Sequence, residues 1–103
     1  MAEVYFPDSI LNFIRSLGSL EVDVFADLHL IQRYGPERFE FCEDHGNDLW
    51  EYRRAIGGSR YAYLLFDAIR GSSSYIVLHG FRGGPEGPSS ADLREARRRR
   101  KAN

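Results

Sequence analysis

The sequence has very few cysteines and almost no lysine. Cys42 is the only cysteine in the 103 residues, which excludes a disulfide within the chain and is typical of a reducing compartment. Its neighbours are apolar or acidic, so we interpret Cys42 as a small core residue and not as a nucleophile. Lys101 is the only lysine, and arginine supplies the rest of the 14 basic residues. Any contact with phosphate therefore falls mainly to arginine, whose forked guanidinium suits that group.

Long hydrophobic runs and the common cofactor motifs are also absent. No stretch approaches the roughly 20 apolar residues of a membrane span, and the first residues lack the pattern of a signal peptide. We therefore expect a cytoplasmic protein without a membrane partner. There is no P-loop, dinucleotide-binding fingerprint or nucleophile elbow. The histidines are dispersed and do not have metal-ligand spacing, so the sequence predicts no metal and no cofactor.

The charges that are present are distributed unevenly. Residues 1–48 hold three arginines and ten acidic residues, a net charge of −7, and residues 49–103 hold 11 basic and five acidic residues, a net charge of +6. The formal total is −1, in agreement with these halves. The chain is therefore dipolar, with an acidic first half and a basic second half.

The hydrophobic periodicity predicts one α+β domain over residues 1–103. A short strand at 2–6 is followed by two amphipathic helices at 8–17 and 19–34, which form a helical hairpin. Alternation of period two begins at Arg38, and glycine-rich or serine-rich turns separate the strands that follow. The later elements are strands at 49–55, 60–67 and 75–81, a turn at 69–74 and a helix from Ser89 or Ser90. We expect a small, mostly antiparallel sheet with the helices on one of its faces.

The apolar stretch 75–81 is the strongest strand signal in this prediction. A continuous β-branched and aromatic run predicts a central strand that is buried on both faces. A glycine-rich segment, predicted to be a flexible loop, follows at 82–88, and the chain ends in a basic tail at 97–103. A rigid strand that leads into a mobile basic segment is a common place for a functional site. The alternative is that Gly80 ends the strand, Phe81 fills the core and the tail is only solvated.

Several segments together resemble a known family. Tyr34-Gly35-Pro36-Glu37 ends the second helix, Leu49-Trp50-Glu51-Tyr52-Arg53 begins a strand, and Leu78-His79-Gly80-Phe81 ends another. Asp92, Leu93 and Ala96 mark a terminal helix. In this order and spacing, over roughly residues 19–100, the segments resemble the RelE/ParE toxin superfamily, and within it the phage-associated HigB-like subgroup.

The resemblance implies a toxin of a type II toxin–antitoxin system. Such a toxin is an endoribonuclease that cleaves mRNA, often on the ribosome, without a metal ion, and a partner antitoxin neutralises it. The family usually has two lysines after the phenylalanine, where this chain has Arg82 and Gly83. Its arginine in the aromatic strand is matched by Arg60 only with a shift of one residue. The alternative function is a non-catalytic binding module with the same fold, acting through a protein or nucleic-acid partner.

Metal-independent RNA cleavage needs cations beside the phosphate and a group that transfers protons. The candidate catalytic residues are Arg53, Arg60, His79 and Arg82. We expect the three arginines to point into one cleft with His79 at its edge, and Arg53→Ala to abolish activity without loss of stability. The alternatives are an ion pair of Arg53 with Glu51 and a core role for His79. His45, in a polar turn, is a weaker candidate for proton transfer.

Aromatic and basic side chains are candidates for contacts with RNA. Tyr61, Tyr63 and Trp50 have the shape to stack on bases, although we favour a core position for Trp50. The basic run at the end of the chain is either a solvated helix end or a contact to phosphates. The residues predicted to bind RNA are Arg97, Arg98, Arg99, Arg100 and Lys101.

Overall fold

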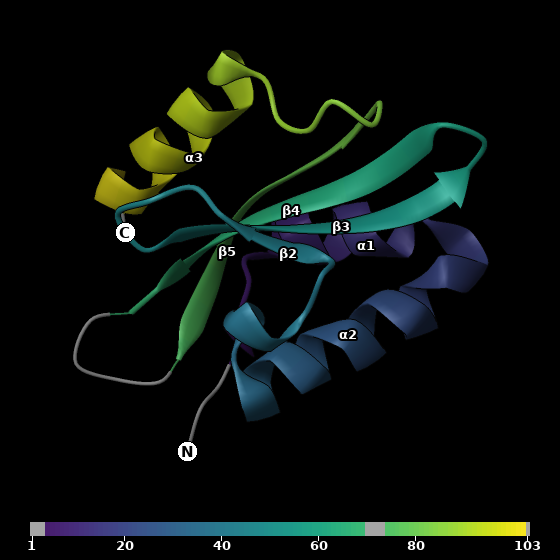
Figure 1. Ribbon diagram of the computed structural model, residues 1–103, viewed down its shortest axis with the longest axis horizontal. Coiled ribbons are helices and arrows are strands. Elements are labelled where there is room, and N and C mark those ends of the chain that lie inside the picture. The colour runs from purple at the N-terminus through teal and green to yellow at the C-terminus, as the bar shows by residue number, and fades with distance from the viewer. Residues whose placement is uncertain (1–3, 70–73, 103) are drawn as a thin grey trace.

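The alternating stretches form a five-stranded sheet with helices on both of its faces (Figure 1). The computed structural model describes residues 4–69 and 74–102, and the expected turn at 69–74 falls mostly outside them. The predicted α+β fold, with a helical hairpin, a mostly antiparallel sheet and a C-terminal helix, is confirmed. The main elements are β1 (Val4–Tyr5), α1 (Asp8–Arg15), α2 (Glu21–Tyr34), β2 (Cys42–Asp44), β3 (Leu49–Gly57), β4 (Arg60–Ala68), β5 (Tyr75–Gly83) and α3 (Ser90–Ala102).

The order of the strands in the sheet is β1-β5-β4-β3-β2. Strands β2 to β5 pair antiparallel with their neighbours in the chain, and β1 joins β5 in parallel. The stretch 75–81, predicted to be the central strand, lies in β5. This strand has a neighbour on each side, but the middle strand of the sheet is β4. Strand β5 also extends to Gly83, so residues 82 and 83 belong to the strand and not to the predicted loop.

The two faces of the sheet can be told apart by the side chains that alternate along β3. Tyr52 lies in the core cluster that α1 and α2 form with the sheet, together with Leu64 and Val77. Leu49 lies in a second cluster with Leu65 on the other face. Because side chains alternate along a strand, Glu51 and Arg53 share the face of Leu49. We call this face the α3 face, and the opposite one the α1/α2 face.

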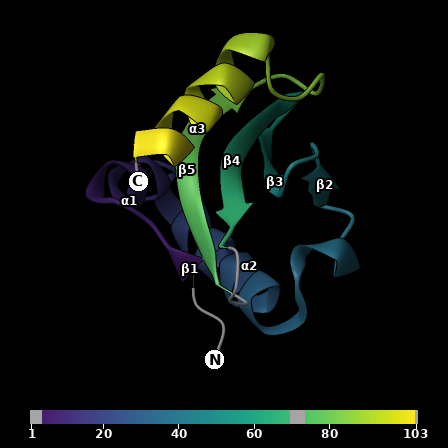
Figure 2. The same ribbon diagram turned by 90° about the vertical axis from the view of Figure 1, so that its left-hand side faces the viewer.

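The prediction that all helices cover one face is wrong for α3. This helix lies across the sheet from α1 and α2 (Figures 1 and 2), and Ala96 and Leu93 pack against Leu49, Leu65 and Leu78. The reason lies in β4, whose consecutive residues 62–66 are all buried. Because these side chains point to both faces of the sheet, helices must pack on both faces. Within the described residues, no helix combines the length and the hydrophobicity that a bilayer span needs.

A β-bulge between β4 and β5 sets the direction of His79. Leu65 pairs with His79 but Phe66 pairs with Val77, so Leu78 is an extra residue on β5. A bulge redirects side chains and increases the local twist. Here Leu78 packs against Ala96 and His79 bonds to α3, so two successive residues both contact α3.

Candidate functional site

Glu51, Arg53, Tyr61 and Tyr63 form a polar and aromatic group on the α3 face, which we call the Arg53 cluster. Arg53 and Tyr63 are directly paired across β3 and β4. The guanidinium carbon of Arg53 lies 5.3 Å from the centre of the Tyr63 ring and 6.0 Å from that of Tyr61. These distances are those of a cation–π contact, which holds the guanidinium over the rings. The side chain of Arg53 is 30% exposed, so part of the fork faces solvent.

Glu51 is completely buried and is the anionic partner of Arg53. Arg53 Nε donates a hydrogen bond of 2.6 Å to Glu51 Oε2, and His45 Nε2 lies 2.9 Å from Glu51 Oε1. A buried carboxylate is costly unless it is paired and hydrogen-bonded, and here both oxygens have partners. Arg53 therefore forms the ion pair with Glu51 that the sequence offered as an alternative to a catalytic role. Replacing Arg53 removes one of these partners, so the structure leads us to expect that Arg53→Ala lowers stability.

The segment between β5 and α3 packs on the Arg53 cluster. The Tyr63 hydroxyl donates to the Gly84 carbonyl, and Arg53 Nη1 donates to the Pro85 carbonyl at 3.2 Å. Gly87 is buried with φ +90°, and a Cβ atom there would lie 3.3 Å from Arg53 Nη2. Burial raises the pKa of the Tyr63 hydroxyl, which keeps it a hydrogen-bond donor at neutral pH. The segment therefore covers one side of the cluster.

His79 lies on the same face but does not reach Arg53. Its Nε2 atom bonds to Asp92 Oδ1 at 3.0 Å in the first turn of α3, and its ring stacks on Phe81 at 5.2 Å. Phe81 in turn stacks on Tyr63 at 5.0 Å, so two aromatic rings separate His79 from the guanidinium. The side chain is 15% exposed. His79 is thus partly buried and held between Asp92 and Phe81, which is closer to the core alternative than to a place in an open cleft.

Arg82 and Arg60 do not converge with Arg53, so the expectation of one shared cleft is wrong. Arg82 pairs across the sheet with Ala62, whose side chain is buried on the α1/α2 face. Its Nη2 atom donates to the carbonyl and the hydroxyl of Ser16 at the C-terminus of α1, at 3.0 and 3.1 Å. Arg60 is exposed next to the β3–β4 turn, and alternation places it on the side of Ala62. Because side chains alternate along a strand, an offset of one residue is enough to place Arg60 and Arg82 on the face opposite Arg53.

The basic run of α3 divides into anchors and an exposed face. Arg99 Nη1 donates to the Leu78 carbonyl at 2.9 Å, and Arg100 Nε forms an ion pair of 2.8 Å with Asp67. Arg98 and Arg99 both bond to Glu95, and together they lower the pKa of that carboxyl to about 2. The outward side of the helix carries a row of cations along a shallow hollow: Arg94, Arg97, Arg98 and Lys101.

Cys42 has the environment of a structural residue. It is partly buried and packs against the core cluster under α1 and α2. Burial raises the pKa of its thiol to about 12, with a further contribution from Asp27, Glu51 and Glu37. The thiolate is therefore scarce at neutral pH, as the prediction that Cys42 is not a nucleophile requires.

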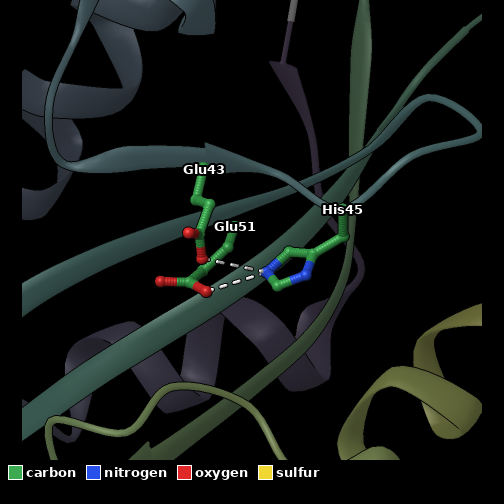
Figure 3. A group of neighbouring side chains, drawn as sticks. All are labelled: Glu43, His45 and Glu51. Carbon is green, nitrogen blue, oxygen red and sulfur yellow. Dashed lines mark hydrogen bonds and ion pairs between the residues drawn. The ribbon is translucent and has the colours of Figure 1, made fainter.

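His45, the weaker candidate for proton transfer, lies beside the Arg53 cluster. Its imidazole faces the carboxylates of Glu51 and Glu43 from one side, with Nε2 at 2.9 and 3.6 Å from one oxygen of each (Figure 3). The signal was present in the sequence as Glu43 and His45 two positions apart before a turn, with Glu51 after it. Only the register of the β2–β3 pairing, in which Glu43 is opposite Glu51, shows that all three meet.

Comparison with known proteins gives a match at the level of the fold. No protein-family model matches the sequence, and no curated protein is detectably similar to it. A solved structure of the E. coli toxin RelE, an arginine-to-alanine double mutant in the free state, superposes with a TM-score of 0.67. The superposition covers 96% of this chain and 98% of that one, at 22% sequence identity. The chain therefore has the RelE fold over nearly its whole length.

Proposed function

We propose that this chain, which shares the fold of the toxin RelE, is the toxin of a type II toxin–antitoxin pair and cleaves translated mRNA. The observation that carries the proposal is the structural match, which covers 96% of this chain and 98% of the RelE chain. The order of the segments quoted above further favours the HigB-like subgroup within that superfamily. A cognate antitoxin and the ribosome are the partners that this function requires, and the cytoplasm is where it operates.

Arg53 is the cation that we assign to the scissile phosphate. It is partly exposed, and among the described residues two of its five N–H donors form hydrogen bonds, to Glu51 and Pro85. A fixed guanidinium stabilises the extra negative charge that develops when the phosphodiester is attacked. Tyr61, beside Arg53 on the same face, has a ring on which a base can stack. We assign Arg82 to the C-terminus of α1 and His79 to the anchoring of α3.

One observation favours the second candidate, a RelE-fold binding module without catalysis. Arg53 is held by Glu51 at 2.6 Å, and Glu43 also lies 3.9 Å from its Nη2 atom. Two carboxylates beside one guanidinium weaken its attraction for a phosphate. In addition, Arg82, which follows Phe81 where the family has lysines, lies on the opposite face of the sheet.

The deciding experiment compares Arg53→Lys with Arg82→Lys. Lysine keeps the charge beside Glu51 but not the planar fork, so the exchange is not conservative at a phosphate site. We expect wild-type protein to arrest growth when induced without an antitoxin and to cleave ribosome-bound mRNA. The rate should fall about 10²-fold or more in Arg53→Lys, the typical effect of losing one transition-state contact. Cleavage sites are mapped by primer extension, and Arg82→Lys should match the wild type.

Two results would count against the catalytic proposal. If the wild-type protein is harmless and leaves mRNA intact on ribosomes, the catalytic proposal fails and the non-catalytic binding module becomes the better candidate. If the wild type cleaves and Arg53→Lys cleaves equally well, the toxin assignment stands but the role of Arg53 does not.

The outer face of α3 should determine how RNA binding depends on salt. Each phosphate contact on a single strand contributes about 0.7 to the slope of log K against log salt concentration. Neutralising three outward cations with Arg94→Gln, Arg97→Gln and Lys101→Gln should therefore flatten the slope by about 2. The measurement is fluorescence anisotropy with a 2′-O-methyl RNA that resists cleavage. Truncation before Arg97 is unsuitable, because it would also remove the anchors Arg99 and Arg100.

A charge-matched control is available in the acidic half of the chain. Arg15, Arg33 and Arg38 are exposed, and their exchange for glutamine removes the same number of positive charges. We expect the control to retain the wild-type slope. Equal slopes for the α3 variant and the wild type would mean that this face is only solvated.

A further inference from the structure

The side chains of Glu43, His45 and Glu51 meet at one point of the β2–β3 hairpin (Figure 3). Glu43 and Glu51 are direct partners across the two strands, and His45 begins the connecting turn. The backbone fixes this turn: His45 N donates to the Leu49 carbonyl at 2.9 Å, and Gly46 N donates to Asp44 Oδ1 at 2.8 Å. Three potential ligands are thus held together by local backbone geometry.

The charges around these side chains do not balance. Glu51 is buried, Glu43 lies beside it, and Arg53 supplies one positive charge for the two carboxylates. Arg53 is paired with the buried Glu51, so the remaining negative charge is that of Glu43, whose side chain is 61% exposed. This net charge attracts a cation to the position that His45 faces. A divalent metal ion meets that demand and can also use the imidazole as a ligand.

The spacing of the donor atoms matches that of ligands around a small metal ion. His45 Nε2 lies 2.9 Å from Glu51 Oε1 and 3.6 Å from Glu43 Oε2, and one donor atom of each residue lies within 4.8 Å of the others. Ligand bonds of about 2.0–2.2 Å place neighbouring ligand atoms about 3–3.5 Å apart. The Glu43 side chain is 61% exposed and can adjust to complete the set, which leaves room for water on the outer side.

We propose that Glu43, His45 and Glu51 bind one divalent transition-metal ion of the zinc class. His45 Nε2, Glu51 Oε1 and one oxygen of Glu43 are the ligands, and Nε2 releases its proton when the ion binds. Arg53 stays on Glu51 Oε2 and orients that ligand, as hydrogen-bond partners of ligands in metal sites commonly do. The imidazole selects zinc over magnesium and calcium, which prefer oxygen ligands.

The ion would act beside the Arg53 cluster but would not take part in the proposed cleavage. It would draw Glu43 away from the Nη2 atom of Arg53, where the two side chains now lie 3.9 Å apart. The guanidinium would then have one anionic neighbour fewer. The metal site rests on the geometry and the charges of the hairpin and does not depend on ribonuclease activity.

The test is a calorimetric titration of chelator-treated full-length protein with ZnCl₂ and, separately, with MgCl₂. We expect saturable binding of one Zn²⁺ per chain and at least tenfold weaker binding of Mg²⁺. His45→Gln and Glu43→Gln should each weaken Zn²⁺ binding at least tenfold. His29→Gln, which alters an exposed histidine on α2, is the matched control and should bind like the wild type. Substituting Co²⁺ adds a visible spectrum that should be lost in His45→Gln.

The outcomes of this titration are independent of RNA cleavage. Absence of Zn²⁺ binding in the wild type would mean that His45 serves only as a hydrogen-bond donor to Glu51. Binding that survives in His45→Gln would place the ion elsewhere, and either result overturns the proposal. Because no RNA is present, a failure of the proposed ribonuclease function leaves this measurement unaffected.

Discussion

Arg53→Met should lower the free energy of unfolding by about 3 kcal/mol, the low end of the range for breaking a buried ion pair. The cause is Glu51, which is 0% exposed and, of its two side-chain partners in the described part of the chain, would keep His45 and lose Arg53. The low end is appropriate because Arg53 is 30% exposed, so solvent screens part of the interaction. Methionine retains much of the aliphatic stem, which limits the loss of packing. Denaturant unfolding at neutral pH measures the change.

A double-mutant cycle separates the charge from the packing. In the background of Glu51→Gln the buried group is neutral, so the additional loss from Arg53→Met should be much smaller than in the wild type. Arg82→Met is the control on the opposite face and should cost below about 1 kcal/mol, as expected for an exposed site. Equal losses from Arg53→Met in both backgrounds would show that the pair contributes little, and the cluster would then be held by stacking.

Phe66→Ala should be at least as destabilising, with a loss of about 3–5 kcal/mol. Phe66 is 1% exposed in the middle strand of the sheet, and its ring meets that of Tyr75 edge-on at 5.7 Å. Removing the ring leaves a cavity between β4 and the helices that the rigid sheet cannot close. Trp50, which the sequence favours as a core residue, is only partly buried, so Phe66 provides the stronger test.

Thermal and denaturant unfolding of Phe66→Ala give the measurement. Tyr34→Ala is the aromatic control, because Tyr34 is 49% exposed at the end of α2 and its loss should cost about 0.5 kcal/mol or less. A loss of similar size in the two variants would refute the packing of α1 and α2 on this face of the sheet.

Most of the fold could be predicted from the sequence because its signals are local. The 3.6-residue period of α1 and α2, the glycine turns and the alternation of β3 each depend on neighbouring residues. The position of α3 could not be predicted in this way. Its apolar side is thin, with Leu93 and Ala96, and the demand for a cover arises from β4, which is buried on both faces.

The site was harder to predict because it depends on pairing between strands. The sequence gives Glu51 and Arg53 the same face, but the register of β4 and β5 decides the placement of Arg60, Arg82 and His79. The bulge at Leu78 and the pairing of Arg82 with Ala62 follow from that register. No residue pattern in the sequence indicates either of them. The approach of His45 to Glu51 likewise depends on the pairing of β2 with β3.

The parallel pairing of β1 with β5 has a consequence for how the chain assembles. Val4 pairs with Tyr75 and Tyr5 with Ile76, so these contacts join residues about 70 positions apart. Closing so long a loop costs entropy before any contact compensates it, and non-local pairing of this kind slows folding. During synthesis, the apolar sides of α1 and α2 have no complete sheet to pack on until β5 has left the ribosome. We therefore expect the native state to form only after most of the chain has been made.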